Sequence, residues 1–308
     1  MKTDAFDRLA LSCVVEPGDP RLVAELSIRE PGELIEHIAT GDSQFTDEHQ
    51  FRALRAKDAA FRAIENSKES KLRWIVPTDR DWPAQVNDLD HVEPINSATG
   101  APLGLWVRGD CFPNLGATVS IVGAREATAY GRDAASNFAA ELAESGYVIV
   151  SGAAFGIDAA AHRGALGVGG QTVAVLAGGA DIDYPRAHDQ LLAQIARAGA
   201  VISEQLPLAT PLKNRFLSRN RIIAALGLGT LVVEAALRSG SLNTLHWADQ
   251  LSRVTMGLPG PYDFRSSAGV HEAIRNGKAI MVTSAAQVAQ ALEPIGAPVC
   301  EPRLFRAQ

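Results

Sequence analysis

Short apolar runs alternate with helical patterns along the chain from residue 118 onward. The runs are rich in Val, Ile, Leu and Ala, and helical spacing follows in segments such as 132–144 and 158–166. This alternation predicts an α/β fold, in which a mostly parallel sheet is covered by helices on both faces. The predicted strands are 118–123, 147–151, 172–177, 200–203, 230–234, 254–258 and 279–283.

The N-terminal part of the chain has a different pattern. It is rich in charged residues and helix formers, and it contains no strong strand signal. Phe51, Leu54, Phe61 and Ile64 recur at near-helical spacing, which predicts a small helical domain over residues 1–70.

A segment rich in tryptophan and proline joins the two patterns. Trp74, Trp82 and Trp106 lie there among prolines, and we expect them to pack over the following domain. After Leu292, closely spaced Pro and Gly residues predict a tail. The predicted organisation is therefore a helical domain (1–70), an extended sheet domain (71–293) and a tail (294–308).

Composition narrows the class of protein. The net charge of −6 and a pI near 5.7 argue against a protein that coats nucleic acid through its overall field, but they leave room for a local basic site. The longest charge-free apolar run, 222–233, has 12 residues, which is too short to span a bilayer. Cys13, Cys111 and Cys300 form neither a disulfide framework nor a metal-binding spacing, which suggests the reducing cytoplasm.

One segment combines positive charge with an aromatic residue. Residues 213–221 read K-N-R-F-L-S-R-N-R, with four cations and one aromatic in nine residues. Cations at the start of a helix oppose its dipole, so helix stability does not explain them. They could form a solvated face or pair with acidic residues elsewhere. An aromatic among cations suggests a phosphate ligand that carries a base. The candidate ligand-contacting residues here are Lys213, Arg215, Phe216, Arg219, Asn220 and Arg221.

A turn rich in small residues follows the next predicted strand. Such a turn at the start of a helix presents free backbone N–H groups and the positive end of the helix dipole to an anion. A serine cap without a ligand explains this turn alone equally well, but its position beside the basic segment favours a phosphate site. The candidate residues here are Ser239, Gly240, Ser241, Asn243 and Thr244.

Ligands of a parallel sheet lie beyond the carboxyl ends of its strands, so the other strand ends are also candidates. The first strand ends at Gly123, Ala124 and Arg125, where small residues allow close approach and the arginine could hold a phosphate. On this turn alone, a plain tight turn with a surface arginine is the favoured interpretation. The second strand is followed by Gly152 and, on the next helix, by Asp158.

Two pairs of polar residues near these strand ends have less specific interpretations. Asp158 and His162 could be catalytic, but no serine or cysteine nucleophile is evident nearby. A helix cap and a hydrogen-bonded histidine are the favoured interpretation. Asp181 and Asp183 could bind a cation, although turn formation is the simpler explanation.

Common cofactor motifs are absent from the sequence. It contains no G-x-G-x-x-G, which argues against a nicotinamide or flavin cofactor. It also contains no G-x-x-x-x-G-K-[ST], so P-loop ATP hydrolysis is not supported. We expect no cofactor, no metal and no catalytic residue.

The motifs occur in the order typical of one bacterial family. The chain resembles the DNA-processing A family (DprA, also called Smf) over roughly residues 72–290. The matching residues are 121–125, Thr128-Ala129-Tyr130-Gly131, Ser151-Gly152, Gly156-Ile157-Asp158, Ala161-His162, Tyr184-Pro185, Ser203-Glu204, Phe216, Arg219-Asn220-Arg221, Glu234, Ser239-Gly240-Ser241, Pro259-Gly260 and Ser267-Ala268-Gly269.

The resemblance implies an extended Rossmann-like, doubly wound domain that binds single-stranded DNA. It also implies a homodimer that protects incoming DNA and helps to load the RecA recombinase in natural transformation or other recombination. By motif position, Arg125 resembles the arginine of a Gly-Ser-Arg DNA-binding motif. Lys213 and Phe216 resemble a DNA-contacting lysine and a base-pocket aromatic, and Arg219 and Arg221 flank that pocket.

The chain departs from the family pattern in three places. Ala124 stands where the family has serine, which we expect to remove one hydrogen bond to phosphate. Leu245 and His246 stand where a small residue is usual. The sequence also stops without the winged-helix-like C-terminal domain of many members.

A nucleotide-cleaving enzyme is the competing interpretation. Related phosphoribohydrolase-like proteins use a Gly-Gly-x-Gly-Thr-x-x-Glu turn to cleave nucleoside monophosphates. When Thr244 is aligned with that threonine, Trp247 occupies the position of the catalytic glutamate. The loop geometry is shared but the acid/base residue is not, so the sequence favours binding over catalysis.

Overall fold

A computed structural model describes residues 2–41, 44–109 and 117–293 of the chain; the predicted tail, 294–308, lies outside them. The strands are β1 (Arg73–Ile75), β2 (Leu105–Arg108), β3 (Thr118–Gly123), β4 (Val148–Ser151), β5 (Thr172–Val175), β6 (Ala200–Ser203), β7 (Gly229–Val233), β8 (Val254–Leu258) and β9 (Ile280–Met281). They form one sheet of nine strands in the order β1-β2-β6-β5-β4-β3-β7-β8-β9.

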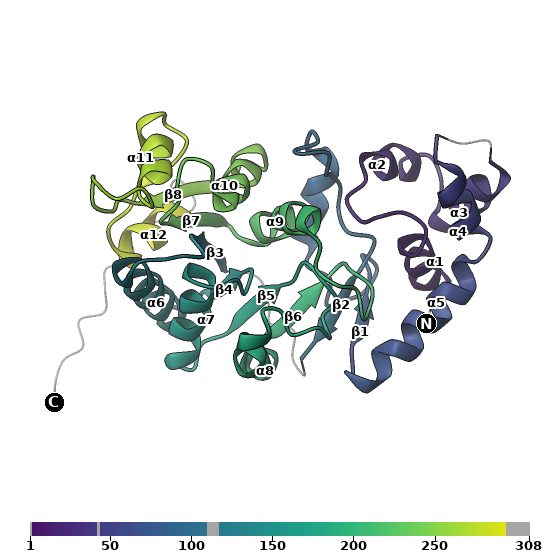
Figure 1. Ribbon diagram of the computed structural model, residues 1–308, viewed down its shortest axis with the longest axis horizontal. Coiled ribbons are helices and arrows are strands. Elements are labelled where there is room, and N and C mark those ends of the chain that lie inside the picture. Colours follow the sequence, from purple (N-terminus) through teal and green to yellow (C-terminus); the bar gives the residue numbers. More distant parts are fainter. Residues whose placement is uncertain (1, 42–43, 110–116, 294–308) are drawn as a thin grey trace.

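Helices cover both faces of this sheet (Figure 1). The 3₁₀ helix η1 (Ala84–His91) packs against α9, and η2 (Arg186–His188) precedes α8. The α-helices are α1 (Thr3–Ser12), α2 (Pro20–Leu26), α3 (Pro31–Thr40), α4 (Asp47–Ala53), α5 (Ala56–Glu69), α6 (Ala129–Glu144), α7 (Ile157–Gly167), α8 (Asp189–Ala198), α9 (Lys213–Leu226), α10 (Gly240–Gln250), α11 (Ala268–Arg275) and α12 (Ala285–Leu292).

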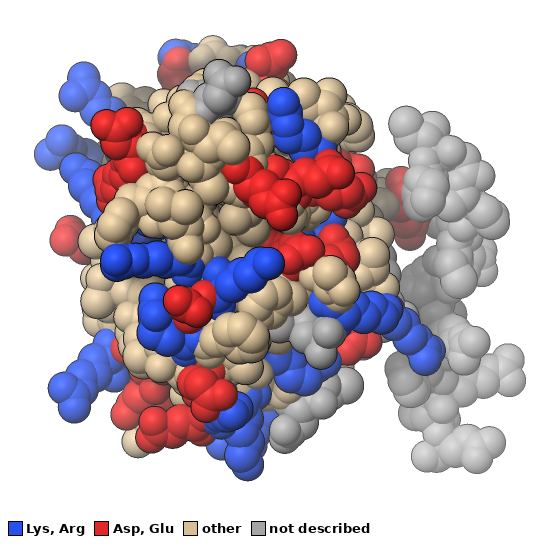
Figure 2. Space-filling view, turned by 90° about the vertical axis from the view of Figure 1, so that its right-hand side faces the viewer, with Lys and Arg blue, Asp and Glu red and all other residues tan. Residues whose placement is uncertain are grey.

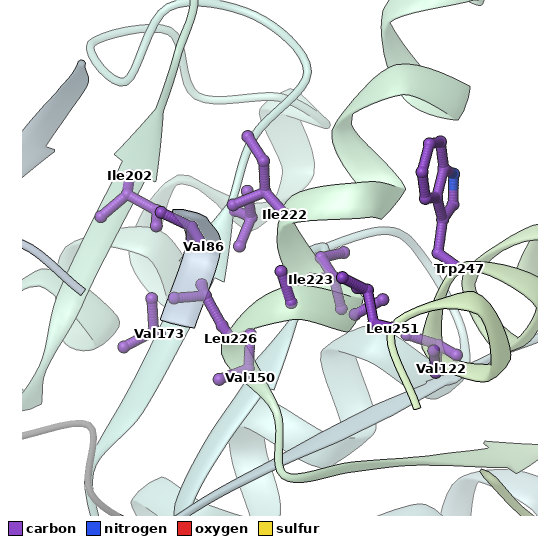
Figure 3. Packing of buried hydrophobic residues seen from close by; sticks show 14 of the residues in the cluster. Val86, Val122, Val150, Val173, Ile202, Ile222, Ile223, Leu226, Trp247 and Leu251 are labelled. Carbon is purple, nitrogen blue, oxygen red and sulfur yellow. The ribbon is translucent and has the colours of Figure 1, made fainter. Parts of the chain in front are cut away.

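The predicted fold class is confirmed: the sheet is mostly parallel and doubly wound. Alternate residues of β3 enter different cores, because successive side chains of a strand point to opposite faces. Val119 and Ile121 pack with α6 and α7, whereas Val122 packs beneath α9 and α10. Figure 3 shows the second of these cores, where Ile222 and Leu226 of α9 meet strand valines.

The sheet contains two strands that the apolar pattern did not predict. β1 and β2 are antiparallel to their neighbours and extend the sheet beyond β6. Both come from the segment of tryptophans and prolines, and Trp106 on β2 is only 1% exposed. Trp74 and Trp106 therefore lie on strands. The prolines around them hid this from the apolar pattern.

The direction of strand order changes at β3. From β3 the chain continues to β4, β5 and β6 on one side, and it then returns to place β7 and β8 on the other side. In doubly wound sheets such a reversal opens a crevice at the carboxyl ends of the central strands. The ends of β3, β4 and β7 therefore meet where a ligand is expected.

The first five helices pack together at one end of the sheet (Figure 1). Leu9, Leu34 and Ile38 form their core, and Trp106 of the sheet packs into it. The helices predicted from the spacing of Phe51, Leu54 and Phe61 are present, and all three of these side chains are exposed.

On α5, small residues face the helical core in place of the phenylalanine. On α5 the buried residues include Ala56, Ala60 and Ala63, whereas Phe61 is 60% exposed. Short side chains let α5 approach α1 closely. Figure 2 views the molecule from this end, and basic and acidic side chains are interspersed over that face.

A buried ion pair ties α9 to the sheet. Both terminal nitrogens of Arg221 donate to the Glu204 carboxylate, each at 2.6 Å, directly after β6. Arg221 Nε donates to the Gly100 carbonyl oxygen at 3.0 Å, and the side chain of Arg221 is fully buried. The guanidinium is therefore almost completely paired, which fixes the position of α9 against β6 and the segment around residue 100.

We expect Arg221→Met to lower the free energy of unfolding by about 3–5 kcal/mol, because it leaves the Glu204 carboxylate buried without a partner. Chemical denaturation measures this change. Arg275→Met is the matched control, since Arg275 pairs with Glu272 at the surface and its side chain is 73% exposed. The control should change the free energy by less than about 1 kcal/mol. Equal, small losses in both variants would contradict the structural role of Arg221.

Candidate nucleic-acid interface

A cleft of about 830 Å³ lies at the carboxyl ends of β3, β4 and β7 and at the start of α9. It coincides with the reversal of strand order. The sequence-predicted residues that line it are Gly123, Ala124, Arg125, Lys213, Phe216, Arg219, Asn220, Ser239, Gly240 and Ser241.

The loop after β3 is held from two sides. Ala124 N donates to the Glu234 carbonyl oxygen at 2.8 Å, and Ile157 N donates to the Ala124 carbonyl oxygen at 3.1 Å. Gly156 lies against this loop with φ +77°, and a Cβ there would clash with the Ala124 carbonyl oxygen. The backbone is thus fixed while the Arg125 side chain remains exposed at the cleft.

The carboxylate of Glu234 supports the same region. Its oxygens accept hydrogen bonds from Thr128 N at 2.9 Å and Thr128 Oγ1 at 2.5 Å, and Glu234 is 2% exposed. Thr128 in turn caps the N-terminus of α6. Glu234 therefore joins the end of β7 to the α6 start.

A stack of three planar side chains stands on one wall of the cleft. The Arg125 guanidinium carbon lies 4.7 Å from the centroid of the Phe216 ring. The Tyr184 ring lies 5.7 Å from Phe216 at an interplanar angle of 54°. Phe216 is only partly buried, so it belongs to the cleft wall and is not one of the core residues.

Arg219 lies below this stack and is buried without adequate pairing. It is 4% exposed, and its Nε and Nη1 atoms have no hydrogen-bond partner. Burial lowers the pKa of Arg219 to about 10, although the nearby Asp158 carboxylate opposes this shift. Gly152 makes room for the guanidinium, since a Cβ at that position would overlap Arg219 Nη1. The cleft thus contains buried donors directed to no protein acceptor.

Asp158 is a buried carboxylate that interacts electrostatically with Arg219. Burial raises the pKa of Asp158, while the positive charge of Arg219 and backbone hydrogen bonds oppose the rise. Its carboxylate accepts from Ala154 N at 3.4 Å. The predicted N-cap role was displaced by two residues, because Gly156 is the capping residue and Asp158 lies in the first turn of α7.

The N-terminus of α10 forms the opposite wall. Ser239 is its N-cap, and its Oγ accepts a hydrogen bond from Ser241 N at 3.3 Å. Asn220 Nδ2 donates to the Gly240 carbonyl oxygen at 3.2 Å and lies 3.3 Å from Asn243 Oδ1. This fixes α10 against α9, so the positive end of the α10 dipole faces the same space as Arg219.

Three sequence-predicted residues lie elsewhere, and the structure corrects them. Arg221 is in the core with Glu204 and cannot contact a phosphate. Arg215 binds Glu16, with Nε 2.6 Å from Glu16 Oε1, and so connects α9 to the N-terminal helices. Thr244 is 1% exposed and faces the core beneath α10. The side of the helix on which Thr244 lies turns it toward the core, and acidic partners distant in sequence hold Arg215 and Arg221 away from the cleft.

Some residues at the cleft were not predicted as site residues. Tyr184 packs on Phe216, while Ala154, Pro211 and Ser266 also line the cleft. Tyr184 follows the end of β5, so the rule that ligands lie beyond strand ends could have found it. Pro211 and Ser266 give no comparable signal in the sequence.

The catalytic Asp158–His162 pair, which was the disfavoured alternative, does not form. His162 Nδ1 lies 2.7 Å from Thr172 Oγ1, and that hydroxyl donates to the Ile149 carbonyl oxygen. Because the hydroxyl proton is used, Nδ1–H of His162 is the donor and its buried Nε2 keeps an unpaired lone pair. The histidine therefore joins α7 to β5, as its structural interpretation predicted.

The two aspartates after β5 are used within the fold. Asp181 accepts a hydrogen bond from Leu208 N, and Asp183 forms an ion pair with Arg108 at 2.8 Å. Both therefore shape the turn. Across residues 2–41, 44–109 and 117–293, no group of three or more His, Cys, Asp or Glu side chains is placed to hold a metal ion.

Comparison with known proteins assigns the family. The family model described as DNA recombination-mediator protein A matches residues 73–293. The chain belongs to this family. The match includes every strand and helix that forms the cleft, and it confirms the DprA/Smf resemblance of the motifs.

Relatives extend the similarity into the N-terminal helices. A putative DNA processing protein DprA of Mycobacterium tuberculosis is 39% identical over 299 residues, which cover 93% of this chain and 74% of that protein. Protein Smf of Escherichia coli is 38% identical over 230 residues, covering 74% of this chain and 60% of that protein.

Two solved structures share the architecture. DprA from Streptococcus pneumoniae superposes with a TM-score of 0.77 at 32% identity, covering 96% of this chain and all of that one. DprA from Helicobacter pylori, whose structure concerns its single-stranded DNA binding mode, gives a TM-score of 0.61 at 27% identity and covers 72% and 95%. Within the described part of this chain, no helix is long and apolar enough to cross a membrane.

The buried His162 predicts acid sensitivity. Burial lowers its pKa from 6.5 to about 3, so the neutral ring is the folded form and the unfolded chain takes up the proton first. Its contribution to stability is complete above pH 6.5 and is lost as the pH falls toward about 3, by up to about 1.4 kcal/mol per pH unit.

Denaturation of the wild type and of His162→Leu over this pH range tests the assignment. The wild type should lose stability more steeply, while the leucine variant should keep a shallower dependence set by its other groups. Parallel pH profiles for the two proteins would contradict a histidine that is buried in its neutral form.

Proposed function

We propose that this chain binds single-stranded DNA in the cleft at the carboxyl ends of β3, β4 and β7. The observation that supports this most directly is the buried Arg219 guanidinium, whose Nε and Nη1 have no protein partner. Buried donors of this kind are costly unless a ligand pairs with them. A phosphate between Arg219 and the α10 N-terminus would satisfy both the donors and the helix dipole.

An unpaired base is the second element of the proposed ligand. The partly exposed Phe216 ring and the Arg125 guanidinium on it offer flat surfaces on which a base can stack. Bases inside a duplex are already stacked and paired, so this wall favours a single strand. Lys213, exposed at the start of α9, adds a cation for a neighbouring phosphate.

The biological role follows from the family. We infer that the chain is a recombination mediator that protects incoming single-stranded DNA in the cytoplasm and helps to load RecA, in natural transformation or another recombination process. We further infer that it acts as a homodimer. The family match, and the similarity to the Helicobacter pylori structure that concerns a single-stranded DNA binding mode, support the DNA-binding part of this proposal.

We infer that the chain acts by binding and not by catalysis. The position that aligns with the glutamate of nucleotide-cleaving relatives holds Trp247, which is fully buried. Glu234, the nearby carboxylate, is occupied by two hydrogen bonds from Thr128. These placements favour a cleft that holds a nucleotide chain without attacking it.

Equilibrium titration with single-stranded and duplex DNA tests the proposal. Single strands should bind more tightly, and their affinity should fall with salt at a log–log slope of about −0.7 for each neutralised phosphate. Phe216→Ala should weaken single-strand binding by roughly 1–3 kcal/mol, the range for a lost stacking contact, and should leave the slope unchanged. Lys213→Ala should instead make the log–log slope shallower by about 0.7, the contribution of one neutralised phosphate.

Thermal melting without DNA is the control for both variants. Since Phe216 is only partly buried, its variant should melt close to the wild type, whereas a core phenylalanine would cost roughly 3–5 kcal/mol. Equal affinity for duplex and single strand would refute the stacking wall. If Phe216→Ala loses DNA binding only because the protein unfolds, Phe216 is a core residue and not a stacking residue.

A further inference from the structure

The loop between β8 and α11, residues 259–267, lies next to the proposed DNA cleft. β8 is the neighbour of β7 in the sheet, so the loop after β8 lies beside the turn that begins α10. Ser266 of this loop lines the cleft itself. Figure 1 shows α10 and α11 adjacent above these strands.

The base of this loop is fixed by hydrogen bonds and close packing. Tyr130 donates its hydroxyl proton to the Pro259 carbonyl oxygen at 2.9 Å, and His271 Nε2 lies 3.1 Å from the Gly260 carbonyl oxygen. At the other end, Gly269 N donates to the Ala235 carbonyl oxygen at 2.7 Å. The loop is therefore anchored to α6 and to the cleft's own β7–α10 turn.

The tip of the loop presents aromatic rings to solvent. Tyr262 is 93% exposed and Phe264 is 42% exposed, and both are followed closely by the exposed Arg265. Arg238, also exposed, lies in the neighbouring β7–α10 turn. A ring as exposed as that of Tyr262 adds little to the core, and exposed rings close in sequence to an arginine are suited to binding unpaired bases and their phosphates.

We propose that Tyr262 and Phe264 form a second base-stacking site, which extends the path of single-stranded DNA from the cleft across the β8–α11 loop. Arg238 and Arg265 contact phosphates along this extension. The inference rests on the proposed function, because it requires a strand bound in the cleft. It adds that the strand leaves the cleft over the α10 N-terminus, where Ser266 makes the loop continuous with the cleft wall.

Single-stranded DNA explains this surface better than a protein partner. A protein interface favours a contiguous apolar core with charged residues at its rim. Here the two rings stand on either side of Asp263, and Arg265 follows them directly, at the edge of the proposed phosphate-binding cleft. A second copy of the chain is the competing occupant, and the test below separates the two.

The test compares oligo-dT of two lengths, roughly 4 and roughly 16 nucleotides, on the wild type and on Tyr262→Ala/Phe264→Ala. The short oligomer fills the cleft only, so the variant should bind it as the wild type does. The long oligomer reaches the loop, and the variant should bind it at least about fivefold more weakly. Tyr262→Phe/Phe264→Tyr retains both rings and should restore the affinity.

Two further variants serve as controls. Arg265→Ala should make the salt slope shallower by about 0.7 for the long oligomer and leave it unchanged for the short one. Phe51→Ala removes an exposed ring on α4, far from the cleft, and should change neither affinity. Like the rings of the β8–α11 loop, the Phe51 ring is exposed and has an arginine close by in sequence, since the guanidinium carbon of Arg55 lies 4.3 Å from its centroid. The control therefore removes an exposed ring next to a cation.

The possible failures are distinguishable. If the wild type binds neither oligomer, the proposed function itself fails. If the wild type binds both and the double alanine variant binds the long oligomer equally well, only the second stacking site is refuted. Light scattering checks the variant's mass, and a loss of affinity that accompanies a change from dimer to monomer would assign the loop to contacts between copies.

Discussion

The buried pair between Arg221 and Glu204 fixes α9, and the site depends on the position of that helix. The two side chains join by two hydrogen bonds of 2.6 Å at a place that solvent does not reach. Residues two apart on a helix point about 200° away from each other. When Arg221 is held in the core, Arg219 is therefore turned toward the cleft.

The orientation of α9 about its axis also determines which of its other residues face the cleft. Phe216 and Arg219 are three residues apart, so they share a face of α9, and Phe216 stands above the buried guanidinium. The Gly152 and Gly156 positions allow the two neighbouring loops to approach this face. The Arg221–Glu204 ion pair and these two glycines thus help to hold a site made of separate strand ends in register.

Sequence patterns predicted the parallel sheet well because each of its strands is a short apolar run between helices. They missed β1 and β2, whose residues lie among prolines and pair antiparallel at the sheet edge. The cleft could be located from strand ends. The individual roles of Arg215, Arg219 and Arg221 could not be assigned, because they depend on Glu16 and Glu204, which are distant in sequence. Similarly, the near-helical spacing of Phe51 and Phe61 could not reveal that alanines would face the core.

The central claim is that Arg219 is retained for a ligand and not for the fold, and Arg219→Met tests it most directly. Methionine fills similar space without a charge, and no hydrogen bond from Nε or Nη1 is lost. We expect the free energy of unfolding to fall by less than in Arg221→Met, because Arg219 acts on the buried Asp158 carboxylate through its charge and not through a hydrogen bond. Affinity for single-stranded DNA should fall roughly 10- to 150-fold, as expected when charged hydrogen bonds to a phosphate are lost. A variant that loses several kcal/mol of stability and binds DNA as tightly as the wild type would contradict this account.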